Sequence, residues 1–168
     1  MDNGYHELDM LLQSISLCDT IDIEKGSELV LEINGKEAAS PEKNLCIKAA
    51  NAFFEYTNIK EGCTIRLIKR IPICAGMGGG SADAAGGLIA LNMLFETRLS
   101  NAELINIGAR LGADVPFFLE GGCARATGIG EKLSKLDFCK MYFVFTKELE
   151  KQSTKRMYEI LDSHNAEV

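Results

Sequence analysis

Apolar and polar residues alternate along three segments near the start of the chain, and this pattern predicts strands at residues 8–17, 20–24 and 29–33. Gly26 and the pair Asn34-Gly35 supply the residue types that tight turns require. We therefore expect these strands to follow one another as a β-meander. Similar patterns predict further strands at residues 63–71, 123–127 and 141–145.

Other segments carry apolar residues at helical spacing. They predict helices at residues 45–56, about 81–95 and 153–161. Ser100 and Glu103 have the spacing of a capping box, so another helix should begin there and stop at Gly112.

Strands and helices are mixed without a regular βαβ alternation, which favours an α+β fold over a doubly wound sheet. The last predicted strand and helix have no partner strands after them in the sequence. We therefore expect one domain over residues 1–136 and the beginning of a second over residues 137–168.

Composition narrows the function classes. The 168 residues carry a net charge of −6, which argues against a broad nucleic-acid surface but leaves room for a local basic pocket. The chain starts without a signal-peptide pattern, and no apolar run is long enough to cross a membrane. Its cysteines form no CxxC pair, which disfavours a zinc site and suits a reducing compartment. We expect a cytoplasmic protein.

A glycine-rich segment is the strongest chemical signal in the chain. Consecutive glycines let several backbone N–H groups point one way, and a following helix adds its free N-terminal N–H groups. Neither a Walker A loop nor a dinucleotide fingerprint fits its spacing. A flexible turn into a tightly packed helix is the alternative interpretation. The segment consists of Pro72, Ile73, Cys74, Ala75, Gly76, Met77, Gly78, Gly79, Gly80, Ser81 and Ala82.

Residues 72–85 resemble the second signature motif of the GHMP kinases. Two more stretches support the resemblance: residues 2–8 (DNGYHEL), and residues 112–118 (GADVPFF) with the glycines and small residues of 121–128. All three occur in the order that the family has. The resemblance implies a ribosomal protein S5 domain 2-like N-terminal domain, followed by the start of a ferredoxin-like domain.

The resemblance also implies a role for each matching residue. Residues 72–82 would hold the ATP phosphates, with Ser81 near a phosphate or Mg²⁺, and Asp114 would act on the substrate hydroxyl. The remaining implied roles are contacts with cytidine for Tyr5 and His6, with adenosine for Asn44 and Lys69, and with the substrate pocket for Ser153 and Thr154.

Each of these residues also has a purely structural interpretation. Asp114 follows a predicted helix end and could be a turn residue, and Lys69 could lie on a solvated edge. Asn44 and Ser153 could be helix caps, and His6 could pack on a sheet beside Tyr5.

The activity that the resemblance implies is phosphorylation, with ATP and Mg²⁺, of the 2-hydroxyl of 4-diphosphocytidyl-2-C-methyl-D-erythritol in non-mevalonate isoprenoid synthesis. Another small-molecule substrate within the family, or a non-catalytic nucleotide-binding remnant, are the alternatives. An RNA-binding module on a similar fold is disfavoured by the acidic balance.

The chain departs from the family at both ends. The family's first strand, with an Ala-Lys-Ile-Asn-Leu-like motif, and its third glycine-rich motif have no counterpart among the 168 residues. We therefore expect a fragment that self-associates through an exposed sheet edge. We also expect negligible turnover, because loss of one transition-state charge partner costs about 3 kcal/mol.

Overall fold

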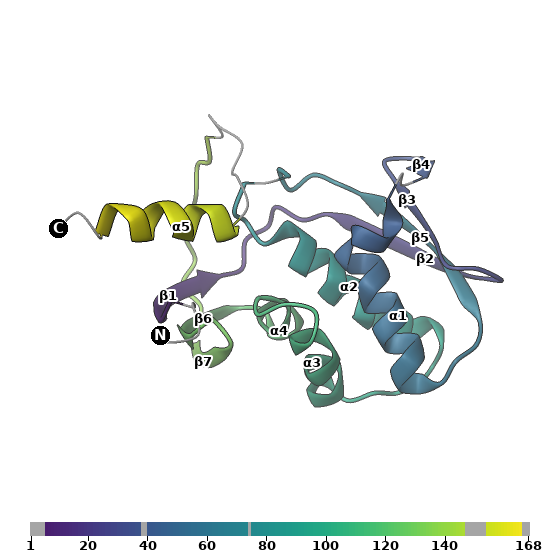
Figure 1. The fold of residues 1–168 in the computed structure, drawn as a ribbon. Helices are drawn as coiled ribbons and strands as arrows, with labels where there is room; N and C mark the ends of the chain where they lie inside the picture. Colours follow the sequence, from purple (N-terminus) through teal and green to yellow (C-terminus); the bar gives the residue numbers. More distant parts are fainter. Residues whose placement is uncertain (1–5, 38–39, 74, 147–153, 166–168) are drawn as a thin grey trace.

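The computed structural model describes residues 6–37, 40–73, 75–146 and 154–165. Its strands form two sheets, and α1 and α2 lie beside the larger one (Figure 1). The strands are β1 (Leu8–Gln13), β2 (Thr20–Gly26), β3 (Val30–Ile33), β4 (Lys36–Glu37), β5 (Gly62–Ile68), β6 (Cys123–Gly128) and β7 (Lys132–Leu136). The helices are the 3₁₀ turn η1 (Pro41–Lys43), α1 (Leu45–Thr57), α2 (Gly79–Leu94), α3 (Asn101–Ala109), α4 (Val115–Glu120) and α5 (Thr154–Asn165).

The larger sheet has the order β2-β5-β3-β4, so the expected β-meander is wrong. β5 pairs antiparallel with β2 and parallel with β3, and it therefore lies between two strands that precede it in the sequence. The parallel pair needs a crossover, and α1 supplies it between β3 and β5. The Asn34-Gly35 turn is confirmed, since both residues have the positive φ that a β3–β4 hairpin requires.

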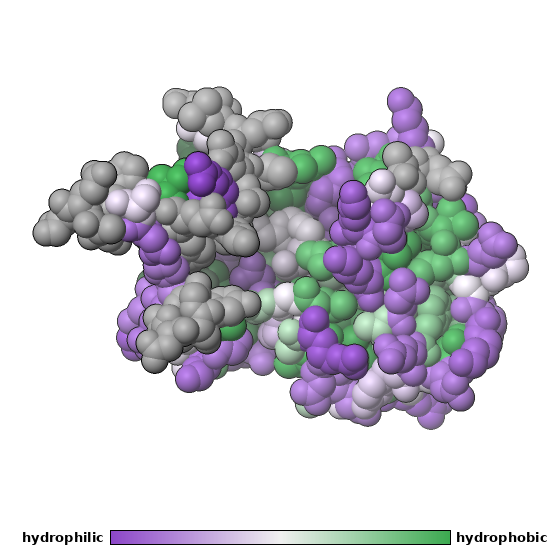
Figure 2. All heavy atoms as spheres, in the orientation of Figure 1, coloured by the Kyte–Doolittle hydropathy of each residue, from purple (hydrophilic) through white to green (hydrophobic). Residues whose placement is uncertain are grey.

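The core lies between this sheet and the helices α1 and α2. Ile65 and Leu67 of β5 belong to one cluster of buried residues with Phe53 of α1 and with Leu88 and Leu91 of α2. Over the helical part of the molecule, apolar side chains also reach the surface, interspersed with hydrophilic ones (Figure 2). The mixture of strands and helices around one such core agrees with the expected α+β class.

The smaller sheet has the order β1-β6-β7. β1 ends at Gln13, earlier than the pattern predicts, while the predicted strand at 123–127 is confirmed as β6. The expected strand at residues 141–145 is wrong. These residues are exposed, and no strand among the described residues pairs with them. Their alternating pattern therefore lacks a neighbouring strand with which it could form backbone hydrogen bonds.

Four short elements of the described chain were not predicted: β4, η1, β7 and α4. β7 pairs with β6 after a turn in which Gly128 and Gly130 have positive φ. α4 begins directly after Asp114 and carries Pro116 in its first turn, where the missing N–H costs nothing. The helix expected at 153–161 is present as α5, and the division at residue 136 stays a prediction. No helix of the described chain combines the length and apolar character needed to cross a bilayer.

The capping box of α3 is confirmed. The Ser100 hydroxyl accepts a hydrogen bond from the Glu103 amide at 3.3 Å, and the Glu103 carboxylate accepts one from the Ser100 amide at 2.8 Å. We expect Ser100→Ala to lower the free energy of unfolding by about 1 kcal/mol, measured by chemical denaturation. Ser27→Ala, in the exposed turn between β2 and β3, is the matched control and should change it by less than about 0.5 kcal/mol. Equal effects in the two variants would contradict this prediction.

Candidate functional site

The glycine-rich segment leads directly into α2, and the helix begins two residues earlier than the pattern predicts. Gly76 has φ +73° and Gly78 has φ +67°, a left-handed conformation that glycine adopts at little cost. The first hydrogen bond into the helix runs from the Ala82 amide to the Gly78 carbonyl at 2.9 Å. The amides of Gly79, Gly80 and Ser81 therefore precede the hydrogen-bonded ladder, and they are the ones suited to bind an anion.

Close packing adds a second requirement for glycine at this turn. A Cβ on Gly78 would lie 2.7 Å from the Phe118 ring, and one on Gly79 would lie 2.9 Å from Cγ2 of Ile71. At Gly80 the nearest atom, Cδ1 of Leu45, would be at an ordinary 3.5 Å. The turn is therefore held against α4 on one side and against the segment that follows β5 on the other.

The turn and Asp114 line the same cavity. This cavity has a volume of about 1130 Å³, and Gly76, Met77, Gly78 and Ala82 contribute to its wall together with Asp114. Asp114 is exposed and stands immediately before α4, where its side chain makes no capping hydrogen bond. The glycine turn that leads into α2 and an exposed carboxylate therefore share one cavity wall.

His6 lies on the wall of the same cavity, beyond the glycine turn. Its Nε2 atom is 3.0 Å from Oδ1 of Asp162 on α5, and Asp162 lines the cavity as well. Apolar side chains complete this part of the wall, among them Leu8, Phe143 and Phe145. The cavity therefore has a mainly apolar region next to its polar end.

Several predicted site residues cannot be placed in this cavity. Tyr5, Cys74 and Ser153 lie outside the described residues, as does the side chain of Thr154. Five residues of the glycine-rich segment are described but do not line the cavity: Pro72, Ile73, Ala75, Gly80 and Ser81. Gly79, the first residue of α2, does not line it either.

Asn44 and Lys69 have structural partners and do not line this cavity. Asn44 is the N-cap of α1, and its Oδ1 accepts a hydrogen bond from the Cys46 amide at 2.8 Å. Lys69 does not lie on a solvated edge, because only 12% of its side chain is exposed. Its ammonium group contacts two carboxylates, those of Asp19 and Asp83. Adenosine contacts by Asn44 and Lys69 stay predictions.

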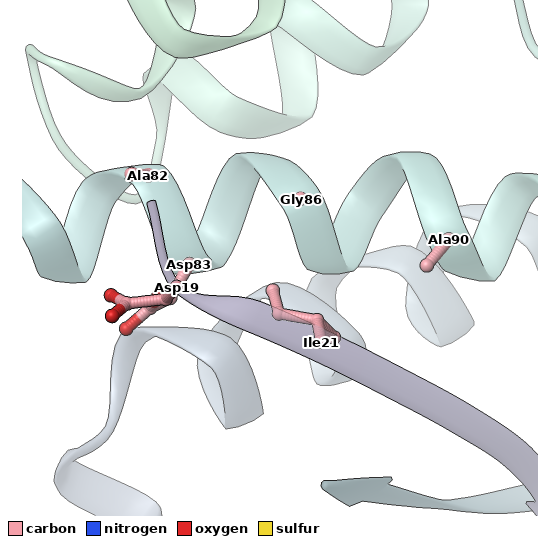
Figure 3. A pocket seen from close by; sticks show the side chains of 6 residues that line it. All are labelled: Asp19, Ile21, Ala82, Asp83, Gly86 and Ala90. Carbon is pink, nitrogen blue, oxygen red and sulfur yellow. The ribbon is translucent and has the colours of Figure 1, made fainter. Parts of the chain in front are cut away.

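Asp19, Lys69 and Asp83 form a buried charged group that the sequence reasoning did not find. We call it the Asp19–Lys69–Asp83 triad. The Lys69 ammonium donates to Asp83 at 2.7 Å and also to Asp19. Both carboxylates line a small cavity of about 250 Å³ along α2, and Figure 3 shows them side by side at the start of that helix. A signal existed, because positions 83, 87 and 91 share the buried face of α2, and a lone acid on such a face needs a cationic partner.

The two carboxyl groups of the triad have opposite pKa shifts. Burial, with the neighbouring Asp19, raises the pKa of Asp83 to about 6 against the attraction of Lys69. Burial also acts to raise the pKa of Asp19, but hydrogen bonds from Lys69 and from the amides of Arg70 and Ile71 outweigh it and lower the pKa to about 2. Asp19 therefore ionises first, and Asp83 gains its negative charge as the pH rises through about 6.

Comparisons with known proteins agree on one family. Residues 44–122 match the family model described as GHMP kinases N terminal domain. The chain is 45% identical over 163 residues to a 4-diphosphocytidyl-2-C-methyl-D-erythritol kinase of Clostridium beijerinckii, covering 96% of this chain and 58% of that protein. It is 40% identical over 162 residues to a protein of the same name from Caldanaerobacter subterraneus. That match covers 96% of this chain and 56% of that protein.

Solved structures give the same picture. A crystal structure of 4-(cytidine 5'-diphospho)-2C-methyl-D-erythritol kinase superposes with a TM-score of 0.69 at 40% identity, over 81% of this chain and 48% of that one. The mevalonate kinase of Methanococcus jannaschii has a TM-score of 0.65 at 20% identity, over 81% of this chain and 50% of that one. At this identity the match shows a shared fold alone. The chain thus spans little more than half the length of the curated relatives that it matches.

Proposed function

We propose that this chain, whose residues 44–122 match the family model of the GHMP kinases N terminal domain, is the nucleotide-binding part of a 4-diphosphocytidyl-2-C-methyl-D-erythritol kinase. The reaction would transfer the γ-phosphoryl group of ATP to the 2-hydroxyl of the methylerythritol unit. One observation carries the proposal: the glycine turn and the Asp114 carboxylate face a common cavity. We assign residues 1–136 to the N-terminal domain and residues 137–168 to the beginning of the next.

Phosphoryl transfer asks the protein for positioning and charge neutralisation more than for covalent chemistry. The amides of Gly79, Gly80 and Ser81 would bind the triphosphate, helped by the positive end of the α2 dipole. Asp114 would hold the acceptor hydroxyl in line with the γ-phosphorus and receive its proton. Its exposure on the cavity side, without a capping bond, leaves both oxygens available for this task.

Mg²⁺ would neutralise charge on the outer phosphates, and we place the Ser81 hydroxyl beside this ion. Ser81 fits such a position, since it occupies the first turn of α2 and its side chain is only half-buried. A small hydroxyl at this place can donate to a phosphate oxygen or contribute an oxygen ligand to a hard cation.

The apolar end of the cavity is where we place the cytidine group. His6, held by Asp162 at 3.0 Å, would donate or accept at the base edge, and Tyr5 would assist. We assign Ser153 and Thr154 to the substrate pocket because the resemblance to the GHMP kinases implies that role for them. An aromatic and aliphatic wall with few polar groups suits a flat base with a polar edge.

The test is ADP release by the native-length polypeptide that carries these residues, with ATP, Mg²⁺ and either the cytidyl substrate or other small alcohols of the family. We expect turnover with 4-diphosphocytidyl-2-C-methyl-D-erythritol and at most traces with mevalonate or homoserine. Turnover with one of these instead would replace the substrate assignment. ADP binding with no turnover on any substrate would favour a nucleotide-binding remnant.

The role of the glycine turn can be tested by a matched pair of substitutions. We expect Gly78→Ala to weaken ADP binding about tenfold, because its Cβ would collide with Phe118 in a left-handed backbone that alanine disfavours. Gly80→Ala keeps its backbone amide, and there is space for the added methyl group. Its Kd for ADP should therefore stay within about twofold of the wild-type value. Isothermal titration calorimetry gives both constants. Equal affinities in the two variants would show that this turn does not shape the nucleotide site.

A further inference from the structure

The glycine-rich loop, described at residues 72, 73 and 75–78, is tied at both of its ends to one buried side chain. We propose that Lys69 is a positioning residue that holds this loop in its nucleotide-binding conformation before any ligand arrives, acting through Asp19 and Asp83. The inference rests on the proposed function for its consequence in nucleotide affinity, but its structural content can be measured without a nucleotide.

The first tie runs from Lys69 across the loop to α2. Lys69 immediately follows β5 and lies three residues before the loop, whereas Asp83 lies on α2, five residues beyond the loop. The 2.7 Å hydrogen bond between the Lys69 ammonium and Oδ2 of Asp83 therefore closes the loop at its base. The ammonium is also close to the helix start, because it lies 3.4 Å from the position of a Cβ on Gly79.

The second tie fixes the segment that enters the loop. Asp19 precedes β2, and its Oδ1 accepts hydrogen bonds from the amides of Arg70 and Ile71, the latter at 2.9 Å. Its Oδ2 accepts from the Lys69 ammonium. One carboxylate thus orients both the backbone that leads into the loop and the lysine that closes it.

Backbone and side-chain contacts outside the triad support the same arrangement. The amide of Lys69 donates to Oδ1 of Asn34 at 3.0 Å, so the end of β5 is also fixed from the β3–β4 turn. The thiol of Cys46 on α1 donates to the Asp83 carbonyl at 3.3 Å. The backbones of Lys69 and Asp83 are therefore also held by the β3–β4 turn and by α1.

The burial of the triad argues that it has a task beyond stability. The side chains of Lys69, Asp19 and Asp83 are 12%, 4% and 5% exposed. Buried ion pairs stabilise weakly compared with apolar residues of the same size, because desolvation offsets the attraction between the charges. Restricting a loop that must present its amides in one direction is a use that an apolar replacement would not serve, since preorganisation reduces the ordering cost of binding.

The test compares Lys69→Met with Arg66→Met. Arg66 is the matched control, since it lies on β5 and also contacts three carboxylates, Asp22, Glu24 and Glu32, but on an exposed face away from the loop. Without nucleotide, we expect amide hydrogen exchange of residues 70–79 to accelerate at least about tenfold in Lys69→Met and to stay unchanged in Arg66→Met. With ADP, Kd should rise about tenfold in Lys69→Met only.

A second pair keeps the inference testable if Lys69→Met does not fold. Asp83→Asn retains an oxygen that can accept from Lys69, so exchange in the loop and the ADP Kd should match those of the wild type. Asp83→Leu removes that acceptor and should reproduce the Lys69→Met result. Loop exchange that is the same in Asp83→Asn and Asp83→Leu overturns the inference. Wild-type protein that fails to bind ADP while its loop still responds to these substitutions would overturn the proposed function instead.

Discussion

Replacing Asp114 by asparagine is expected to lower kcat by about a thousandfold, since a positioned general base contributes two to four orders of magnitude. The amide keeps the size of the side chain and can still accept a hydrogen bond, but it cannot take the proton of the acceptor hydroxyl. The carboxylate makes no capping bond to α4, so the fold should tolerate the change. Steady-state ADP release by the native-length polypeptide, under saturating substrate, measures the effect.

The same variant should separate catalysis from nucleotide binding. ADP affinity is expected to stay within about twofold, because the amides at the start of α2 and not the carboxylate bind the phosphates in our proposal. Glu120→Gln is the control, an exposed acid at the far end of the same short helix, and its kcat should equal that of the wild type. An Asp114→Asn enzyme with more than about a tenth of the wild-type kcat would remove the general base from the mechanism.

The second large effect concerns pH and stability. Asp83 has a pKa of about 6 in the folded protein, above its ordinary value of 3.8. A raised folded-state pKa contributes stability that is complete below pH 3.8 and is lost as the pH rises through 6. Asparagine resembles the protonated acid and does not titrate. We therefore expect the difference in free energy of unfolding, Asp83→Asn minus wild type, to increase by about 3 kcal/mol when the pH is raised from 3.8 to 7.5.

Other groups around Asp83 should not obscure this change. Asp19 has a lowered pKa of about 2, so its contribution is lost only as the pH falls below 3.8, outside the window. Burial raises the pKa of the Cys46 thiol to about 12, and the pKa of Lys69 is raised as well, against burial, by its bonds to the two carboxylates. Urea denaturation at several pH values measures the difference, with Asp137→Asn on the exposed surface as control. A difference that does not vary with pH would mean that Asp83 titrates normally.

Local features of the sequence predicted several local elements of the fold well. The start of α2, the capping box at Ser100 and the Asn34-Gly35 turn depend on residue types within a few positions of one another. Backbone freedom at glycine and side-chain capping at serine operate over that range, so they can be read without the fold. The errors concern pairing: β5 lies between β2 and β3, and residues 141–145 have no described partner strand.

The sequence by itself determined where backbone amides can gather, at residues 76–81, because such turns depend on neighbouring residues, and its resemblance to a family singled out Asp114. Only the tertiary structure decided that these two features share a cavity and that Lys69 faces Asp19 and Asp83. Asp19 and Lys69 are 50 positions apart, and no local pattern specifies which distant charges will be buried together. Their pairing follows from strand order and helix packing, where desolvation makes an unpartnered charge costly.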